Sequence, residues 1–250
     1  MSDPGVVYGL HAVTSLLASE PRSVERLQVS ETGDRRLARV IELAQAAGIE
    51  VQQVSRRELD RSLPNSRHQG VVAQVQSGRC ALSERALPDF LAALEEPAFL
   101  LVLDGVQDPH NLGACLRTAD AAGVHAVILP KDRAVGITPV VHKVACGAVQ
   151  SVPVFTVTNL ARTLRSLREA GIWLFGASDA AEQDLYASDL KGPVALVLGG
   201  EGGGLRRLTR DLCDHMVSIP MTGTVESLNV SVAAGVLLFE ALRQRRQLQS

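Results

Sequence analysis

Isolated polar residues stand beside glycines at three places in the second half of the chain. The segment DGVQDPHNLGACLRTADAAG carries Asn111 and Arg117, and the segment ALVLGGEGGGLRRLT has Glu201 among five glycines. The third segment, IPMTGTVESLNVSVAAG, places Ser227 and Asn229 before a run of small apolar residues. Glycine lets a backbone approach a ligand closely, so these loops suit the binding and orientation of a substrate.

The residue types in these loops exclude several other kinds of chemistry. No histidine is paired with both an acid and a nucleophilic serine, and no cysteines or histidines have metal-ligand spacing, so we expect no metal. The glycine spacing matches neither the dinucleotide fingerprint GxGxxG nor the triphosphate loop GxxxxGK[ST]. A nicotinamide-dependent dehydrogenase is therefore disfavoured.

Each loop also has a plain structural interpretation. Asn111 fits a helix N-cap, and Arg117 alone could be an ordinary surface cation. Ser227 or Asn229 could cap the next helix, although a single cap residue would suffice. Glu201 is harder to explain in this way, because nothing would shield or pack a lone carboxylate among glycines. The glycine-rich segment therefore favours a functional loop.

The elements that must position these residues form an alternating pattern from residue 99 onward. The predicted strands are FLLVLDGV, HAVILP, VPVFTV, IWLFGAS, VALVLGG and HMVSIP. The predicted helices lie near 111–122, 138–149, 159–170, 205–213 and 227–245. Continuous apolar strands are typical of a parallel sheet covered on both faces, which predicts a doubly wound α/β domain. In such a domain all three loops would lie at the ligand-binding edge.

The preceding residues predict a smaller α/β unit and a connection. Residues 1–77 contain the helical patterns GLHAVTSLLAS and RRLARVIELAQAAG and the strand patterns VERLQVS, IEVQQVS and GVVAQVQ. The arginines of this unit are nearly balanced by acids, so a solvated face is favoured over an RNA-contact face. Residues 78–97 lose the strand pattern and are interpreted as a linker with one short helix, followed by a domain over 98–250.

The composition narrows the class of protein. A net charge of −2 argues against a strongly basic chain that binds any nucleic acid, and 3% aromatic residues argue against a base-stacking platform. The four cysteines form no CxxC pair, which favours reduced thiols. The sequence has neither a signal-like N-terminus nor an apolar run near membrane-spanning length, so we expect a cytoplasmic protein without a membrane partner.

Taken together, the three segments resemble the motifs of the SpoU (TrmH) family of RNA ribose 2′-O-methyltransferases. The patterns NLGxxxR, GxEGxGL and IPMxGxxxSLNVSVA occur in the family's order between about residues 99 and 245. Residues 6–76 are similar to the family's substrate-binding domain. The resemblance implies a C-terminal SPOUT α/β domain with a deep trefoil knot, preceded by a small α/β ribosomal-protein-like RNA-binding domain. It also implies a homodimer with the active site at its interface.

The resemblance further implies a reaction and a set of residues. The implied reaction transfers a methyl group from S-adenosylmethionine to the ribose 2′-hydroxyl of a guanosine in 23S rRNA. The implied catalytic residues are Asn111, Arg117, Glu201, Ser227 and Asn229. The implied cofactor-binding residues are Leu198, Gly199, Ile219, Met221, Leu228 and Asn229.

Some alternatives stay open at this stage. The family suggests Arg117 as the base, but an arginine rarely loses its proton, so a phosphate-gripping or oxyanion-stabilising role is equally consistent. Either subunit of the dimer could supply this residue. The substrate could be a tRNA or another rRNA, or the chain could be a non-catalytic RNA-binding factor for ribosome assembly.

Overall fold

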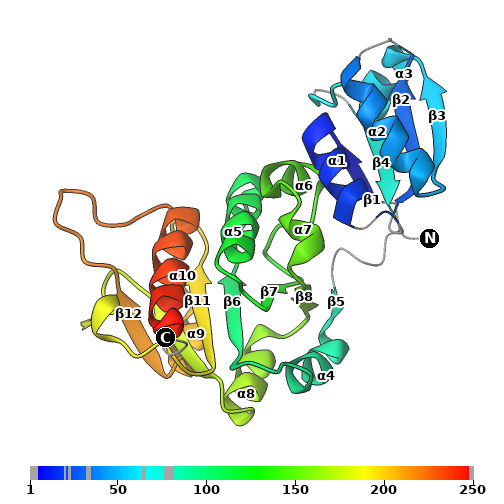
Figure 1. Ribbon diagram of the computed structural model, residues 1–250. Coiled ribbons are helices and arrows are strands. Elements are labelled where there is room, and N and C mark those ends of the chain that lie inside the picture. The colour runs from blue at the N-terminus through cyan, green and yellow to red at the C-terminus, as the bar shows by residue number, and fades with distance from the viewer. Residues whose placement is uncertain are drawn as a thin grey trace. The chain divides into compact units, whose positions relative to one another are not determined.

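The computed structural model divides the chain into two compact units, drawn in Figure 1. One consists of Met1–Cys80 and Ile137–Ser151, and the other of Ala81–Gly136 and Val152–Ser250. The residues that the structure describes are 5–19, 21, 24–31, 35–63, 66–75 and 82–247. Within these residues, no helix combines the length and the apolar character needed to cross a membrane.

The first unit is built on a four-stranded mixed sheet with the strand order β1-β4-β2-β3. The strands are β1 (Gly5–Tyr8), β2 (Val24–Ser30), β3 (Glu50–Val54) and β4 (Val71–Val75). The central strand β4 is antiparallel to β1 and β2, whereas β2 and β3 are parallel. The helices are α1 (Leu10–Ser19), α2 (Arg35–Ala46) and α3 (Arg56–Ser62). Alternate residues of β4 pack in two separate apolar clusters, which places a core on each face of the sheet.

Two elements of this unit, β1 and α3, are not predicted by the sequence patterns. Strand β1 has only four residues, and α3 buries only Leu59 among polar neighbours, so neither shows a clear periodicity. Helix α3 begins instead at a capping box, in which Ser55 Oγ accepts from the Glu58 backbone and Glu58 accepts from the Ser55 backbone at 2.8 Å. The pattern S-x-x-E is therefore the signal that would have found this helix.

The segment predicted as one helix near 138–149 forms two short helices, α6 (Pro139–Ala145) and α7 (Ala148–Ser151). The break lies at Cys146 and Gly147, whose φ angles of 52° and 102° are left-handed. A Cβ atom on Gly147 would lie 2.5 Å from Ser15 Oγ of α1, so any other residue would strain the backbone and displace this side chain. The two helices thus pack within the first compact unit, although their residues follow a strand of the second.

The second unit contains an eight-stranded parallel sheet with the order β10-β12-β9-β11-β6-β7-β8-β5. Its strands are β5 (Leu82–Ser83), β6 (Phe99–Asp104), β7 (Ala126–Pro130), β8 (Val154–Val157), β9 (Trp173–Ala177), β10 (Gln183–Asp184), β11 (Val194–Gly199) and β12 (His215–Ser218). All six apolar strands predicted from the sequence are present. The α/β class expected for this part of the chain is confirmed.

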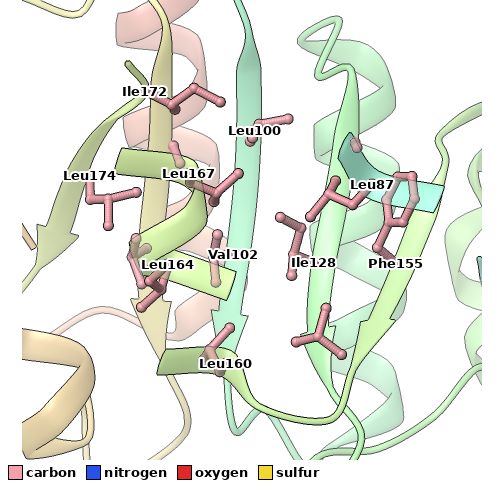
Figure 2. Packing of buried hydrophobic residues seen from close by; sticks show 14 of the residues in the cluster. Leu87, Leu100, Val102, Ile128, Phe155, Leu160, Leu164, Leu167, Ile172 and Leu174 are labelled. Atoms are coloured by element: carbon pink, nitrogen blue, oxygen red, sulfur yellow. The ribbon is translucent and has the colours of Figure 1, made fainter. Parts of the chain in front are cut away.

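Helices cover both faces of this sheet. They are α4 (Leu87–Ala92), α5 (Pro109–Ala121), α8 (Leu160–Glu169), α9 (Arg207–Leu212) and α10 (Val230–Arg246). Figure 2 shows Leu160, Leu164 and Leu167 of α8 in the cluster that includes Leu100 and Val102 of β6. Helix α10 packs on β11 and against α5. Every residue of β6 is buried, because both faces of the strand are covered.

Much of the segment interpreted as a linker, 78–97, is packed into the second unit. Strand β5 pairs with β8, and Leu87 of α4 is buried in the apolar cluster. Glu84, in the 3-10 helix η2 (Glu84–Ala86), accepts hydrogen bonds from the Thr158 backbone at 2.7 Å and from Arg162 at 2.6 Å. Residues 78–81 of the segment lie outside the described residues.

Candidate active site

A cavity of about 540 Å³ opens at the carboxyl ends of β9, β11 and β12. Its walls come from the segment after β9, the glycine-rich loop after β11 and the loop between β12 and α10. The residues that the sequence analysis assigns to the cofactor all line it: Leu198, Gly199, Ile219, Met221, Leu228 and Asn229. Apolar side chains with a few convergent polar groups are typical of a small-molecule site.

The glycine-rich loop folds back on itself at the carboxyl end of β11. Gly200 and Gly204 form an isolated antiparallel bridge. A Cβ atom on Gly199 would lie 1.9 Å from the carbonyl carbon of Gly204, and one on Gly200 would lie 2.2 Å from the carbonyl oxygen of Gly105. No side chain fits at either position, so the spacing of these glycines reflects close packing of backbone on backbone.

A chain of side-chain hydrogen bonds joins all three polar loops. Asn111 Nδ2 donates to Glu201 Oε1 at 2.7 Å, and Asn229 Nδ2 donates to Asn111 Oδ1 at 3.1 Å. The backbone N–H of Gln107 donates to the other carboxylate oxygen, Glu201 Oε2, at 3.2 Å. The expectation that the three loops meet at one edge of the sheet is therefore confirmed.

Glu201 serves this network as an ionised acceptor. Partial burial by itself would raise its pKa, but hydrogen bonds from Asn111 and from the backbone of Glu201, Gln107 and Asp108 outweigh the burial and lower the pKa below its ordinary value. A carboxylate held in this way is a poor proton acceptor at neutral pH. Glu201 is thus suited to anchoring the loops.

The expectation that Asn111 caps α5 is wrong. Asp108 is the N-cap and accepts a hydrogen bond from the His110 backbone at 2.8 Å, with Pro109 at the first helical position. Asn111 therefore lies within the first turn, where its amide is directed to Glu201 and Asn229. The short spacing of Asp108 and His110 reflects this cap.

Asn229 and Ser227 have different places at the start of α10. Asn229 is the N-cap, and its Oδ1 accepts from the backbone N and Oγ of Ser231 at 2.9 and 2.6 Å. Ser227 lies before the helix and lines the cavity. Asn229 alone therefore caps the helix. Ser227 is not needed for capping, and it is positioned to contact a ligand in the cavity.

Arg117 is exposed on α5 and is not among the described residues that line the cavity. The structure thus brings together four of the five residues assigned to catalysis, whereas Arg117 lies further along α5 and outside the cavity lining. An ion pair between Asp104 and Arg206, beside the glycine-rich loop, is not predicted from the sequence. A charged residue at the end of the apolar strand FLLVLD was the available signal.

The cysteine nearest to the candidate site in the sequence, Cys115 of α5, is buried. Burial, with a further contribution from the carboxylate of Glu201, raises the pKa of Cys115 to about 12, so its thiol stays protonated. No group of three or more histidine, cysteine, aspartate or glutamate side chains in the described residues has the arrangement of a metal site.

Comparison with protein families accounts for this combination of loops. Residues 98–239 match the SpoU rRNA Methylase family, and residues 6–79 match the family described as RNA 2′-O ribose methyltransferase substrate binding. The chain belongs to the SpoU rRNA Methylase family. Both matches agree with the resemblance seen in the motifs.

Relatives within the SpoU family align over nearly the whole chain. The 23S rRNA (guanosine-2′-O-)-methyltransferase RlmB of Escherichia coli K12 is 52% identical over 241 residues, which cover 96% of this chain and 98% of the relative. RlmB of Ralstonia nicotianae is 55% identical over 246 residues, which cover 98% of each.

Solved structures of the SpoU family share the fold. The SpoU methyltransferase AviRb from Streptomyces viridochromogenes, in complex with AdoMet, superposes with a TM-score of 0.78 at 27% identity, covering 97% of this chain and 90% of AviRb. An AdoMet-bound rRNA methyltransferase from Sinorhizobium meliloti gives a TM-score of 0.77 at 26% identity, covering 98% and 88%.

Proposed function

We propose that this chain transfers a methyl group from S-adenosylmethionine to the ribose 2′-hydroxyl of a guanosine in 23S rRNA. The observation that carries the proposal is the convergence of all three family motifs on one cavity through the Glu201–Asn111–Asn229 hydrogen bonds. Relatives named for this reaction match nearly the full length of the chain. An rRNA substrate supports the proposal that the protein is cytoplasmic.

The residues that line the cavity suit the chemistry of S-adenosylmethionine. Gly199 contributes backbone to the cavity wall, and Leu198, Ile219, Met221 and Leu228 supply apolar surface. When bound, the cofactor supplies a methyl group already activated on a sulfonium. The residues of this chain therefore need mainly to orient it and to exclude water.

The charges of the lining residues complement the charges of the same ligand. Asp179, Glu201 and Glu226 line the cavity, as does one basic residue, Arg210. Carboxylates favour a sulfonium and an ammonium group nearby, and a guanidinium suits a carboxylate. No basic cluster lines the cavity among the described residues, which disfavours a nucleoside triphosphate.

Arg117 is proposed to stabilise charge on the RNA rather than to accept a proton. Its guanidinium remains protonated in proteins, so it suits a phosphate or the oxygen that develops negative charge as the hydroxyl proton leaves. Asn111, Ser227 and Asn229 would hold the ribose and the loops in place. Because Arg117 does not line the cavity of its own chain, a second subunit is the natural source of this group.

The homodimer has support from the exposed face of α10. Val232 and Phe239 are 51% and 48% exposed, and Val236 is half-buried one turn after Val232. These residues form one apolar stripe with helical spacing, opposite the buried residues of the same helix. A second copy packed on this stripe would place the active site at the interface. The trefoil knot remains a prediction from the family.

The proposal is tested by incubating the protein with radiolabelled S-adenosylmethionine and unmodified 23S rRNA, and mapping the labelled ribose. We expect incorporation at one guanosine and none into tRNA. Incorporation into tRNA alone would favour the tRNA alternative. Binding to rRNA without incorporation into any RNA would contradict the enzymatic proposal and favour an assembly factor.

A further inference from the structure

An ion pair connects the end of β6 to the residue that follows the glycine-rich loop. The Asp104 side chain is fully buried, and its Oδ1 accepts a hydrogen bond from Arg206 Nε at 2.6 Å and contacts Arg206 Nη2. Its Oδ2 accepts from the Arg206 backbone N–H at 3.2 Å. Neither residue lines the cavity, so the pair lies outside the site described above.

Asp104 holds both ends of the glycine-rich loop. At the start of the loop, Asp104 is the register partner of Gly199, and its carbonyl oxygen accepts from the Gly200 backbone at 3.0 Å. At the end of the loop, its carboxylate holds the backbone and side chain of Arg206. Asp104 therefore forms hydrogen bonds at both the start and the end of the loop from Gly199 through Gly204.

Between these two points the loop is held by the Gly200–Gly204 bridge and by the hydrogen bonds of Glu201, and its other residues are glycines. Gly202 and Gly204 have φ angles of 76° and 60°, and a glycine-rich segment samples many conformations unless it is held. A site whose loop is already ordered binds its ligand more tightly, because less conformational freedom is lost on binding. Loss of the ion pair would therefore lower the affinity for the cofactor.

We propose that Asp104 and Arg206 are positioning residues that fix the conformation of the glycine-rich loop and thereby set the affinity for S-adenosylmethionine without touching it. The inference rests on the proposed function, because it takes S-adenosylmethionine as the ligand of the cavity. A buried carboxylate is costly unless it is paired, so Asp104 needs Arg206 as its partner.

The deciding experiment compares Arg206→Gln with Arg207→Gln. Arg207 is the adjacent arginine, its side chain is 96% exposed, and it forms a 3.9 Å ion pair with the exposed side chain of Asp211. We expect Arg206→Gln to raise the Kd and the KM for S-adenosylmethionine about tenfold, while kcat at saturating cofactor stays within about twofold. Arg207→Gln should match the unaltered protein.

Calorimetry, steady-state kinetics and thermal unfolding are measured on the same full-length preparations. A lower kcat with unchanged KM in Arg206→Gln would overturn the inference, because loss of folded protein lowers kcat alone. Arg206→Lys keeps the charge but loses the two-nitrogen contact, and should give an intermediate KM; it repeats the comparison if the glutamine variant does not fold. Absence of cofactor binding by the unaltered protein would overturn the proposed function as well, whereas equal KM values would overturn this inference alone.

Discussion

Asn111 Nδ2 lies 2.7 Å from Glu201 Oε1, although 90 positions separate the two residues in the sequence. The other end of the same amide, Oδ1, accepts from Asn229. One side chain thus uses both its donor and its acceptor to join three loops. Asn111, which the sequence pattern suggests as a helix cap, therefore connects the three loops of the candidate site.

Replacement of this junction by a carboxylate should separate the loops. Asn111→Asp removes the donor and places a second negative charge beside Glu201, so we expect cofactor affinity to fall about tenfold or more, since a hydrogen bond to a charged group is worth roughly 1.5–3 kcal/mol. Calorimetry with S-adenosylmethionine measures the change. The neighbouring exposed residue offers the control His110→Gln, which should bind normally.

Arg117→Ala is expected to abolish methyl transfer while cofactor affinity changes by no more than about twofold, because its proposed contact is to the RNA and it does not line the cavity. Transfer to 23S rRNA and cofactor binding are measured on one preparation. Equal loss of both activities would show that Arg117 has a structural role.

The glycine-rich loop provides a matched pair of substitutions. Gly199→Ala forces a Cβ atom to within 1.9 Å of the Gly204 backbone, whereas a Cβ atom on Gly223 meets nothing within 4 Å. We expect Gly199→Ala to lose cofactor binding and about 1–3 kcal/mol of stability through overpacking. Gly223→Ala should retain both in calorimetry and denaturant unfolding. Normal cofactor binding by Gly199→Ala would contradict this close-packed arrangement.

His142 of α6 should make stability depend on pH. Burial lowers its pKa to about 4 in the folded protein, below the ordinary value of 6.5. Its stabilising effect is complete above pH 6.5 and is lost as the pH falls toward 4, because the unfolded chain binds the proton first. Denaturant unfolding at pH 7 and pH 4.5 should show a smaller difference for His142→Gln than for the unaltered protein. Replacement of the exposed His11 by Gln serves as the control. An unchanged pH dependence in His142→Gln would show that His142 is not the source of the pH-dependent stability.

Phe239→Glu should disrupt the proposed dimer by placing a charge in the apolar stripe of α10. Light scattering coupled to size exclusion should give the mass of a dimer for the unaltered protein and of a monomer for this variant. Leu208 of α9 is also exposed and apolar but lies outside the stripe, so Leu208→Glu should remain dimeric. A monomeric unaltered protein would contradict the dimer.

The sequence patterns predict the parts of the fold that have strong periodicity. The six apolar strands of the second unit and the meeting of three loops at one edge follow from hydrophobic pattern and from the geometry of parallel sheets. The short edge strands β5 and β10 are missed, because two residues carry no period. The break at Cys146 is missed because a left-handed residue there depends on packing around Gly147.

The partners of polar side chains are the least predictable part of the site. The sequence identifies three isolated polar residues in loops that contain glycine, namely Asn111, Glu201 and Asn229. Their mutual hydrogen bonds depend on how three loops that are distant in the sequence pack together. The pairing of Asp104 with Arg206 likewise depends on the register of β6 with β11. Local sequence contains no information about such a register by itself.

The eight-stranded sheet ends on each side in a strand of two described residues, β5 and β10. An edge this short offers few unpaired backbone groups onto which a strand of another molecule could be added, so it protects against edge-to-edge aggregation. The long, apolar central strands are the segments most prone to such aggregation, and they stay enclosed between their neighbours. Growth of the sheet into larger assemblies is thereby discouraged at both margins.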